Sequence, residues 1–188
     1  MKKVFTKLGV IMMTLSMFTF SSCEELKDLL KFDFDLEGET IEIVVAELEV
    51  GEGVEIGKEQ FEKSLEQIIK ENQPDADLSK IKAIKLTNIS MQIVKNGDEG
   101  NNFQNLGSIY TEVRASGLND LLVAKKENIN SDVPQYRLDL PVEGGSIDVK
   151  NYFSKTDFEY VVKADVVKET TKELTIQIKA DYSFTFGL

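Results

Sequence analysis

The segment 174-LTIQIKADYSFTF-186 decides the fold. Apolar and polar side chains alternate across all thirteen positions, which places every apolar side chain on one face of a β-strand. A long unpaired edge of this kind would invite aggregation, so we predict that the strand is paired along most of its length. The polar side chains that should then face water are Thr175, Gln177, Lys179, Asp181 and Ser183.

Further strand-like segments lie ahead of this one. The run 158–166 alternates in the same way, a long strand region is expected at 79–95, and further runs occur at 32–36, 41–50, 108–115, 121–126 and 136–140. Turn-forming residues separate them, and no helices alternate with them. About eight strands at short spacing predict a mainly β fold, specifically an antiparallel β-sandwich with one covering α-helix.

Two of the runs change the parity of their apolar positions. In 41–50 the change falls after Val45, and it predicts a bulge or bend within one strand. In 79–95 the residues Ile84 and Leu86 have one parity, whereas Ile89, Met91 and Ile93 have the other. Simple alternation therefore predicts that these two sets lie on opposite faces of the strand.

Several short signals predict turns and helices. Gly51, Gly53 and Gly57 predict a loop, and Asn96-Gly97 predicts a hairpin whose turn is the polar run 96–102. A short helical turn is expected at 148–153. The covering helix is expected at 58–72, with an apolar stripe that should dock on a sheet. The stripe consists of Phe61, Leu65, Ile68 and Ile69.

The composition narrows the possible chemistry. The chain has no histidine and a single cysteine, Cys23, so a Ser-His-Asp or Cys-His arrangement cannot form and no disulfide can form within the chain. Zinc, copper and haem sites are disfavoured for the same reason. The formal net charge of −11 opposes binding to nucleic acid or anionic lipid. We therefore expect no cofactor, no metal and no nucleic-acid partner.

The first residues have the layout of a signal peptide. Lys2, Lys3 and Lys7 precede an uncharged apolar run, 8–20, and Ser21-Ser22 leads directly into Cys23. The run is shorter than the ~20 residues that cross a bilayer. Ser21-Ser22-Cys23 resembles the loose lipobox of bacterial lipoproteins. The resemblance implies cleavage before Cys23 and lipidation of its sulfur, and so a membrane partner reached through that lipid.

The resemblance implies three parts: a signal peptide at 1–22, a lipidated tether at 23–31 and the sandwich domain at 32–188. Cleavage would lower the basic count from 22 to 19 against 33 acidic residues, so the net charge would become −14. The expected location is the outer membrane of the cell envelope. The acidic run 24–28 resembles a signal for export to the external face, and a solvated linker in the periplasm is the alternative.

Three functions are compatible with these features. The leading hypothesis is a non-enzymatic module that binds or scaffolds another molecule. A carrier that holds an apolar ligand between the sheets is the first alternative. The second is a glycoside hydrolase that uses carboxylates alone, for which Asp33 with Asp35, or Glu47 with Glu49, would be candidates. The oxygen-rich run 96–102 is a candidate calcium loop, but its spacing does not match an EF-hand loop, and a plain hairpin turn is the preferred interpretation.

Overall fold

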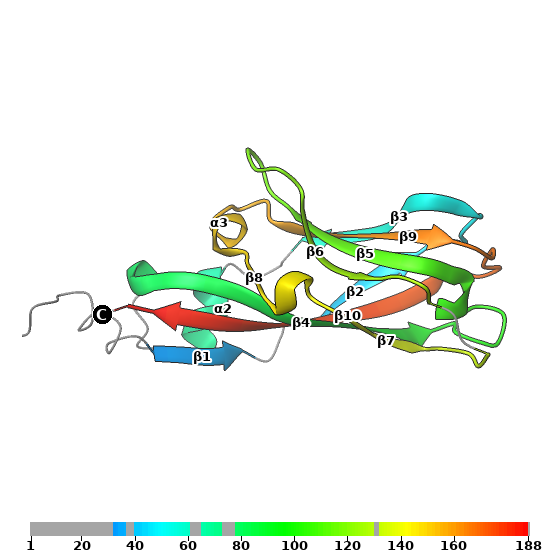
Figure 1. The fold of residues 1–188 in the computed structure, drawn as a ribbon, viewed down its shortest axis with the longest axis horizontal. Coiled ribbons are helices and arrows are strands. Elements are labelled where there is room, and N and C mark those ends of the chain that lie inside the picture. Colours follow the sequence, from blue (N-terminus) through cyan, green and yellow to red (C-terminus); the bar gives the residue numbers. More distant parts are fainter. Residues whose placement is uncertain (1–31, 37–39, 61–64, 73–77, 130–131, 188) are drawn as a thin grey trace, which may run out of the picture.

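The computed structural model describes residues 32–36, 40–60, 65–72, 78–129 and 132–187. These residues form two antiparallel sheets that pack face to face as a β-sandwich, which confirms the predicted fold class (Figure 1). The core lies between the sheets, where the apolar side chains of both layers are almost fully shielded from solvent. Cys23 and the predicted tether 23–31 lie outside the described residues.

The first sheet is organised around β10 (Leu174–Phe186). One side of β10 pairs with β1 (Phe32–Leu36) and β2 (Thr40–Val45), and the other side pairs with β4 (Ile81–Lys95). The far side of β4 pairs with β7 (Arg137–Leu140) and β8 (Ile147–Asp148). The prediction that the strand 174–186 is paired along most of its length is therefore confirmed. One outward side chain departs from the prediction, because Thr175 is only 6% exposed.

The second sheet has the order β3-β9-β5-β6. Its strands are β3 (Gly51–Gln60), β9 (Glu159–Val166), β5 (Leu106–Arg114) and β6 (Leu121–Lys126). Each sheet is four strands wide, because β1 and β2 share one edge of β10 and β7 and β8 share one edge of β4. The ten described strands thus occupy eight positions, close to the number that the sequence predicts.

Three bulges adapt β4 to the regular alternation of β10. The register leaves Lys82, Thr87 and Val94 as extra residues on β4. Each extra residue shifts the side-chain parity by one position. As a result Ile81, Ile84, Leu86, Ile89, Met91 and Ile93 are all buried. The prediction that Ile84 and Leu86 face away from the other set was wrong, because simple alternation takes no account of bulges.

The segment from Val45 to Gln60 differs from its prediction in two ways. The parity change after Val45 marks the end of β2, and the chain then leaves the first sheet and enters the second as β3. The three glycines lie inside β3 instead of in a loop. Two irregularities in the pairing of β3 with β9 accommodate them, and Gly53 has a φ of +61°, which glycine adopts readily.

The covering helix is shorter than predicted. Residues 58–60 belong to β3, and α2 spans Leu65–Asn72. Ile69 is fully buried and belongs to the core, so the docking prediction is confirmed at this position. Phe61 lies outside the described residues, as do the side chains of Leu65 and Ile68. The short helix α3 (Lys150–Phe153) lies where a helical turn was predicted.

Two tyrosines connect the sheets through the core. The hydroxyl of Tyr160 on β9 hydrogen-bonds to the hydroxyl of Tyr182 on β10. Phe153 of α3 stacks on Phe158 at a centroid distance of 4.4 Å and meets the ring of Tyr182 edge-on at 5.1 Å. Burial raises the pKa of Tyr160 far above its ordinary value. This aromatic cluster fixes how the two sheets lie on each other at the α3 end.

Candidate functional site

The two ends of the sandwich differ in what they carry. β1 begins and β10 finishes at the end occupied by α2 and α3 (Figure 1). At the opposite end four connections meet: 46–50, 96–105, 127–136 and 167–173. We call these four connections the loop end, and residues 130–131 within it are not described. In many β-sandwich proteins, connections gathered at one end form the binding surface.

Hydrogen bonds join the four connections to one another. The amide of Thr170 donates to the carbonyl of Leu48 at 3.0 Å, and the amide of Leu48 donates to Thr170 Oγ1 at 2.8 Å. Phe103 N donates to the carbonyl of Gln135 at 2.9 Å. Val167 N donates to the carbonyl of Asn105 at the same distance. The loop end is therefore one connected structure rather than four separate loops.

Three asparagines form the interior of the loop end. Asn101, Asn102 and Asn105 are each only 2% exposed. Asn102 accepts hydrogen bonds from Gln104 N and Gln135 N, and it caps the 3₁₀ helix η2 (Phe103–Asn105). Asn105 Nδ2 donates to the carbonyls of Gly100 and Glu169, at 3.1 and 2.8 Å. These buried amides replace water as partners for the backbone of the loops.

The run 96–102 is a turn, although the predicted hairpin does not form. Asn96 has a φ of +62°, and the tightest reversal lies further on, where Asp98 and Asn101 bridge across Glu99-Gly100. The strands on either side, β4 and β5, belong to different sheets. The Asn96-Gly97 pair thus lies where the chain crosses from one sheet to the other. Local turn chemistry cannot distinguish this crossing from a hairpin between paired strands.

The oxygen atoms proposed as calcium ligands already accept hydrogen bonds from the chain. Asp98 Oδ1 accepts from Gly100 N at 2.9 Å and from Asn101 Nδ2 at 2.8 Å, and Oδ2 accepts from Lys172 Nζ. Asn101 Oδ1 accepts from Thr171 N at 2.7 Å. Within the described part of the chain, no group of three or more metal-ligating acidic, histidine or cysteine side chains comes together. The arrangement favours a structural turn.

Exposed large apolar side chains gather around the loop end. Among the described residues, six such side chains are exposed, and all belong to the loop end or to the adjoining strand ends. They are Val44, Val50, Val94, Val133, Tyr136 and Val167. Scattered exposed apolar residues are ordinary on a protein surface, but their confinement to one end is typical of a contact surface.

A hollow of about 380 Å³ lies at the edge of the loop end, between Val50 and Val167. Asp165 and Glu52 also line it. The carboxylate of Asp165 accepts hydrogen bonds from Gly53 N at 2.8 Å and from the hydroxyl of Tyr110 at 2.7 Å. The hydrogen bond from Tyr110, followed by that from Gly53, lowers the pKa of Asp165. The hollow therefore combines apolar walls with a carboxylate that is held in place and charged at neutral pH.

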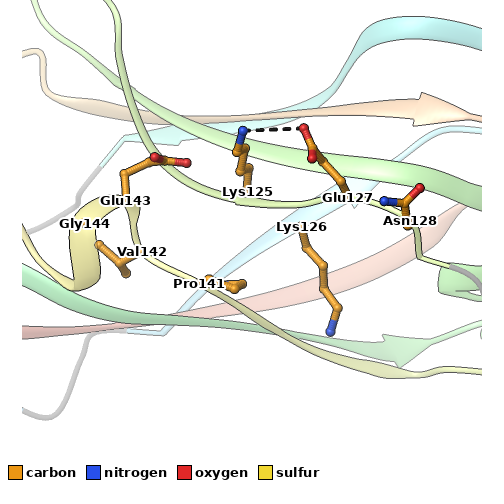
Figure 2. A pocket seen from close by; sticks show the side chains of 8 residues that line it. All are labelled: Lys125, Lys126, Glu127, Asn128, Pro141, Val142, Glu143 and Gly144. Atoms are coloured by element: carbon orange, nitrogen blue, oxygen red, sulfur yellow. Dashed lines mark hydrogen bonds and ion pairs between the residues drawn. The ribbon is translucent and has the colours of Figure 1, made fainter.

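A second hollow, of about 500 Å³, lies where the edges of the two sheets meet. Figure 2 shows Lys125 and Glu127 on one side of β6 and Lys126 on the other. Lys125 Nζ contacts Glu127 Oε1 at 3.4 Å, and Lys126 Nζ donates to the carbonyl of Asp139 at 3.4 Å. Ala124 also bridges to Val142, next to η3 (Glu143–Gly145). These contacts tie β6 to β7 and to the residues that follow it, so we interpret this hollow as part of a sheet edge that the chain itself covers.

Of the two acidic pairs considered for hydrolysis, the structure describes only the side chains of Glu47 and Glu49. Glu47 and Glu49 are exposed and lie in the connection 46–50, not in a strand as predicted. Neither lines the two hollows. The side chains of Asp33 and Asp35 lie outside the described residues, as does Cys23. In the loop end, the sequence analysis singled out the run 96–102 and the pair Glu47 and Glu49; it did not single out Asn105 or Thr170, nor Asp165 of β9 beside the hollow.

No protein-family model matches this chain, and no curated protein matches it significantly. In the part of the chain that the structure describes, none of the helices has both the length and the apolar character needed to span a membrane. Function must therefore be argued from the geometry of the loop end and from the sequence of the first 31 residues.

Proposed function

We propose that this chain is a lipoprotein of the bacterial outer membrane, anchored through Cys23, whose β-sandwich acts as a non-enzymatic binding or scaffolding module. One observation carries the proposal. The loop end lies opposite the end at which β1 begins, and β1 directly follows the tether 23–31 (Figure 1). If the chain is anchored at Cys23, the loop end is the part of the domain that lies furthest from the anchor, measured along the long axis of the molecule.

The dimensions support this arrangement. The thirteen residues of β10 run between the two ends, and at about 3.3 Å per residue they span about 40 Å. Cys23 precedes Phe32 by nine positions, so an extended tether would add at most about 30 Å. A partner could thus meet the loop end well beyond the lipid headgroups.

The structure of the loop end supports binding. Its hydrogen-bonded connections are ordered before any partner arrives, which lowers the entropy that binding costs. The core side chains between the sheets, such as Ile109 and Val162, are fully buried. That packing favours a surface contact over the alternative of a carrier with a ligand between its sheets.

Replacing Cys23 by serine tests the anchor. In wild-type cells we expect the chain in the outer-membrane fraction, labelled by a fatty-acid analogue and unreactive toward maleimide, because Cys23 is the only thiol. C23S should be unlabelled and should leave that fraction. Ser22→Ala keeps a small residue before the cysteine, so it should behave like wild type.

Mass spectrometry provides the decisive measurement. The proposal requires a chain that begins at Cys23 and carries the added mass of lipid. A full-length chain whose Cys23 reacts with maleimide would refute lipid anchoring. Protease treatment of intact cells then distinguishes the two faces, because only an external domain would be digested.

A further inference from the structure

We propose that the hollow between Val50 and Val167 receives a lysine or arginine side chain from a partner protein. The inference rests on the proposed binding role of the loop end and specifies the chemistry of the partner. It follows from three properties of the hollow: its apolar walls, its carboxylates and the charge of its surroundings.

The walls fit the stem of a long basic side chain. Val50 and Val167 are 61% and 59% exposed, although each is among the most apolar residue types. Lysine and arginine pack their methylene stems on apolar surface while their charged ends stay with polar partners. A basic side chain lying between the two valines would shield both from water.

The carboxylates fit the charged end of that side chain. Asp165 lies at the hollow, and its carboxylate accepts hydrogen bonds from Gly53 N and from the hydroxyl of Tyr110, with a further one from the Ser108 side chain. An ionised carboxylate offers about four acceptor positions, so about one remains for a cation, and the negative charge attracts it. Glu52 lines the same hollow and adds a second negative charge. Among the residues that the structure describes, no basic side chain lines it.

The charge of the loop end selects the same kind of partner. Its four connections contain eight acidic residues and two lysines. The acidic ones are Glu47, Glu49, Asp98, Glu99, Glu127, Asp132, Glu169 and Glu173. One of the lysines, Lys172, is already paired with Asp98. Such a surface attracts a basic partner and repels a second copy of itself, which disfavours association of this chain with itself through this end.

Fluorescence anisotropy with a defined peptide tests the proposal. The probe is a fluorescein-labelled octapeptide that alternates lysine with valine, and the control peptide has glutamate at each lysine position. The full chain, purified as cells produce it, should bind the lysine peptide and not the glutamate peptide. Raising the salt concentration should weaken the binding, because part of the attraction is electrostatic.

Matched variants locate the binding. Asp165→Asn and, separately, Val167→Ser should each weaken binding of the lysine peptide by about tenfold. Asp139→Asn removes the same charge from an exposed position outside the loop end, and Leu118→Ser truncates a partly exposed apolar side chain in the β5–β6 connection at the opposite end. Both controls should bind as wild type does. Val167→Ser is a surface change, so its result remains interpretable if Asp165→Asn fails to fold.

Three results would overturn the proposal: equal binding of the two peptides, equal weakening by Asp165→Asn and Asp139→Asn, or absence of binding at millimolar peptide. None of these would affect the anchor, which the Cys23→Ser experiment measures independently. Conversely, a chain that lacks lipid could still bind the peptide through this hollow.

Discussion

Two buried threonines show how a single hydroxyl changes stability. Thr170 is 5% exposed, and its hydroxyl accepts a hydrogen bond from Leu48 N. Thr111 on β5 is fully buried, but its hydroxyl has no hydrogen-bond partner among the described residues. A buried polar group without a partner loses its hydration and gains nothing in return. The same substitution should therefore have opposite effects at the two positions.

We predict that Thr111→Val raises the free energy of unfolding by about 1 kcal/mol, since valine has nearly the same shape and no hydroxyl. Thr170→Val should lower it by about 1–2 kcal/mol, because Leu48 N would lose its acceptor. Urea denaturation of both variants measures the difference. Destabilisation by Thr111→Val would indicate that its hydroxyl does have a partner.

Asp98 should make the stability of the loop end depend on pH. The hydrogen bond from Lys172, followed by those from Asn101 and Gly100, lowers the pKa of Asp98 to about 2. A carboxyl group whose pKa is lower in the folded state stabilises the fold above its unfolded pKa, near 3.8, and loses that contribution as the pH falls toward 2. We expect wild type to lose more stability than Asp98→Asn between pH 5 and pH 2.

Thermal unfolding across this pH range measures the effect. Asp139→Asn is the control, because Asp139 is exposed and contacts Arg137 only at 3.7 Å. Parallel pH profiles for wild type and Asp98→Asn would contradict the role given to Asp98.

At the scale of the elements, helix α2 contributes through its buried side chain. Ile69 is fully buried, whereas Gln67 on the same helix is exposed. We predict that Ile69→Ala lowers the free energy of unfolding by about 2–5 kcal/mol, the usual cost of truncating a core side chain. Gln67→Ala should change it by less than about 0.5 kcal/mol. Equal effects in denaturant titrations would mean that the helix docks through other residues.

The pairing of the strands predicts which amides exchange most slowly. β10 and β9 are each paired on both sides, whereas β3 is paired only with β9. Hydrogen exchange should therefore be slowest in 174–186 and 159–166 and faster in 51–60. Mass spectrometry of peptides from exchanged protein measures this order. Rapid exchange throughout 174–186 would contradict the central position of β10.

The same elements show what could be predicted from the sequence. The alternation in 174–186 predicted a long, paired strand because one face of it must be buried. Residues 58–60 were assigned to the covering helix, but they pair with β9, and this pairing outweighs the local preference. The three glycines of β3 likewise suggested a loop from their local preference alone, although the segment pairs with β9. The periodicity of apolar residues indicates local geometry, but it does not indicate which strands will pair with each other.

The loop end could be predicted only in part. The polar run 96–102 identifies a turn, but its contacts with Gln135, Thr171 and Lys172 depend on the order of strands in two sheets. Buried asparagines such as Asn105 cannot be distinguished in the sequence from solvated ones. Asp165 belongs to a regular strand, and only the approach of Gly53 and Tyr110 gives it a role in the hollow.

At the scale of the whole molecule, the proposed anchor specifies an orientation that can be measured. Lipidation would occupy the only thiol, so an introduced cysteine would be the only reactive one. Glu99→Cys places it in the loop end, and Asn119→Cys places it in the β5–β6 connection at the opposite end. A dye at position 119 should transfer energy to a membrane dye more efficiently than a dye at position 99. The reverse order would contradict the proposed orientation.

The antiparallel pairing of β1 and β2 with β10 has a mechanical consequence. β1 pairs with 182–186 and β2 pairs with 174–179, so both lie along the long axis of the molecule. Tension between a held loop end and the residues before Phe32 would act parallel to these strands. In that geometry the inter-strand hydrogen bonds are sheared together rather than peeled apart one after another. With the proposed anchor at Cys23, a partner bound at the loop end could pull on the proposed tether without first separating β1 from β10 one hydrogen bond at a time.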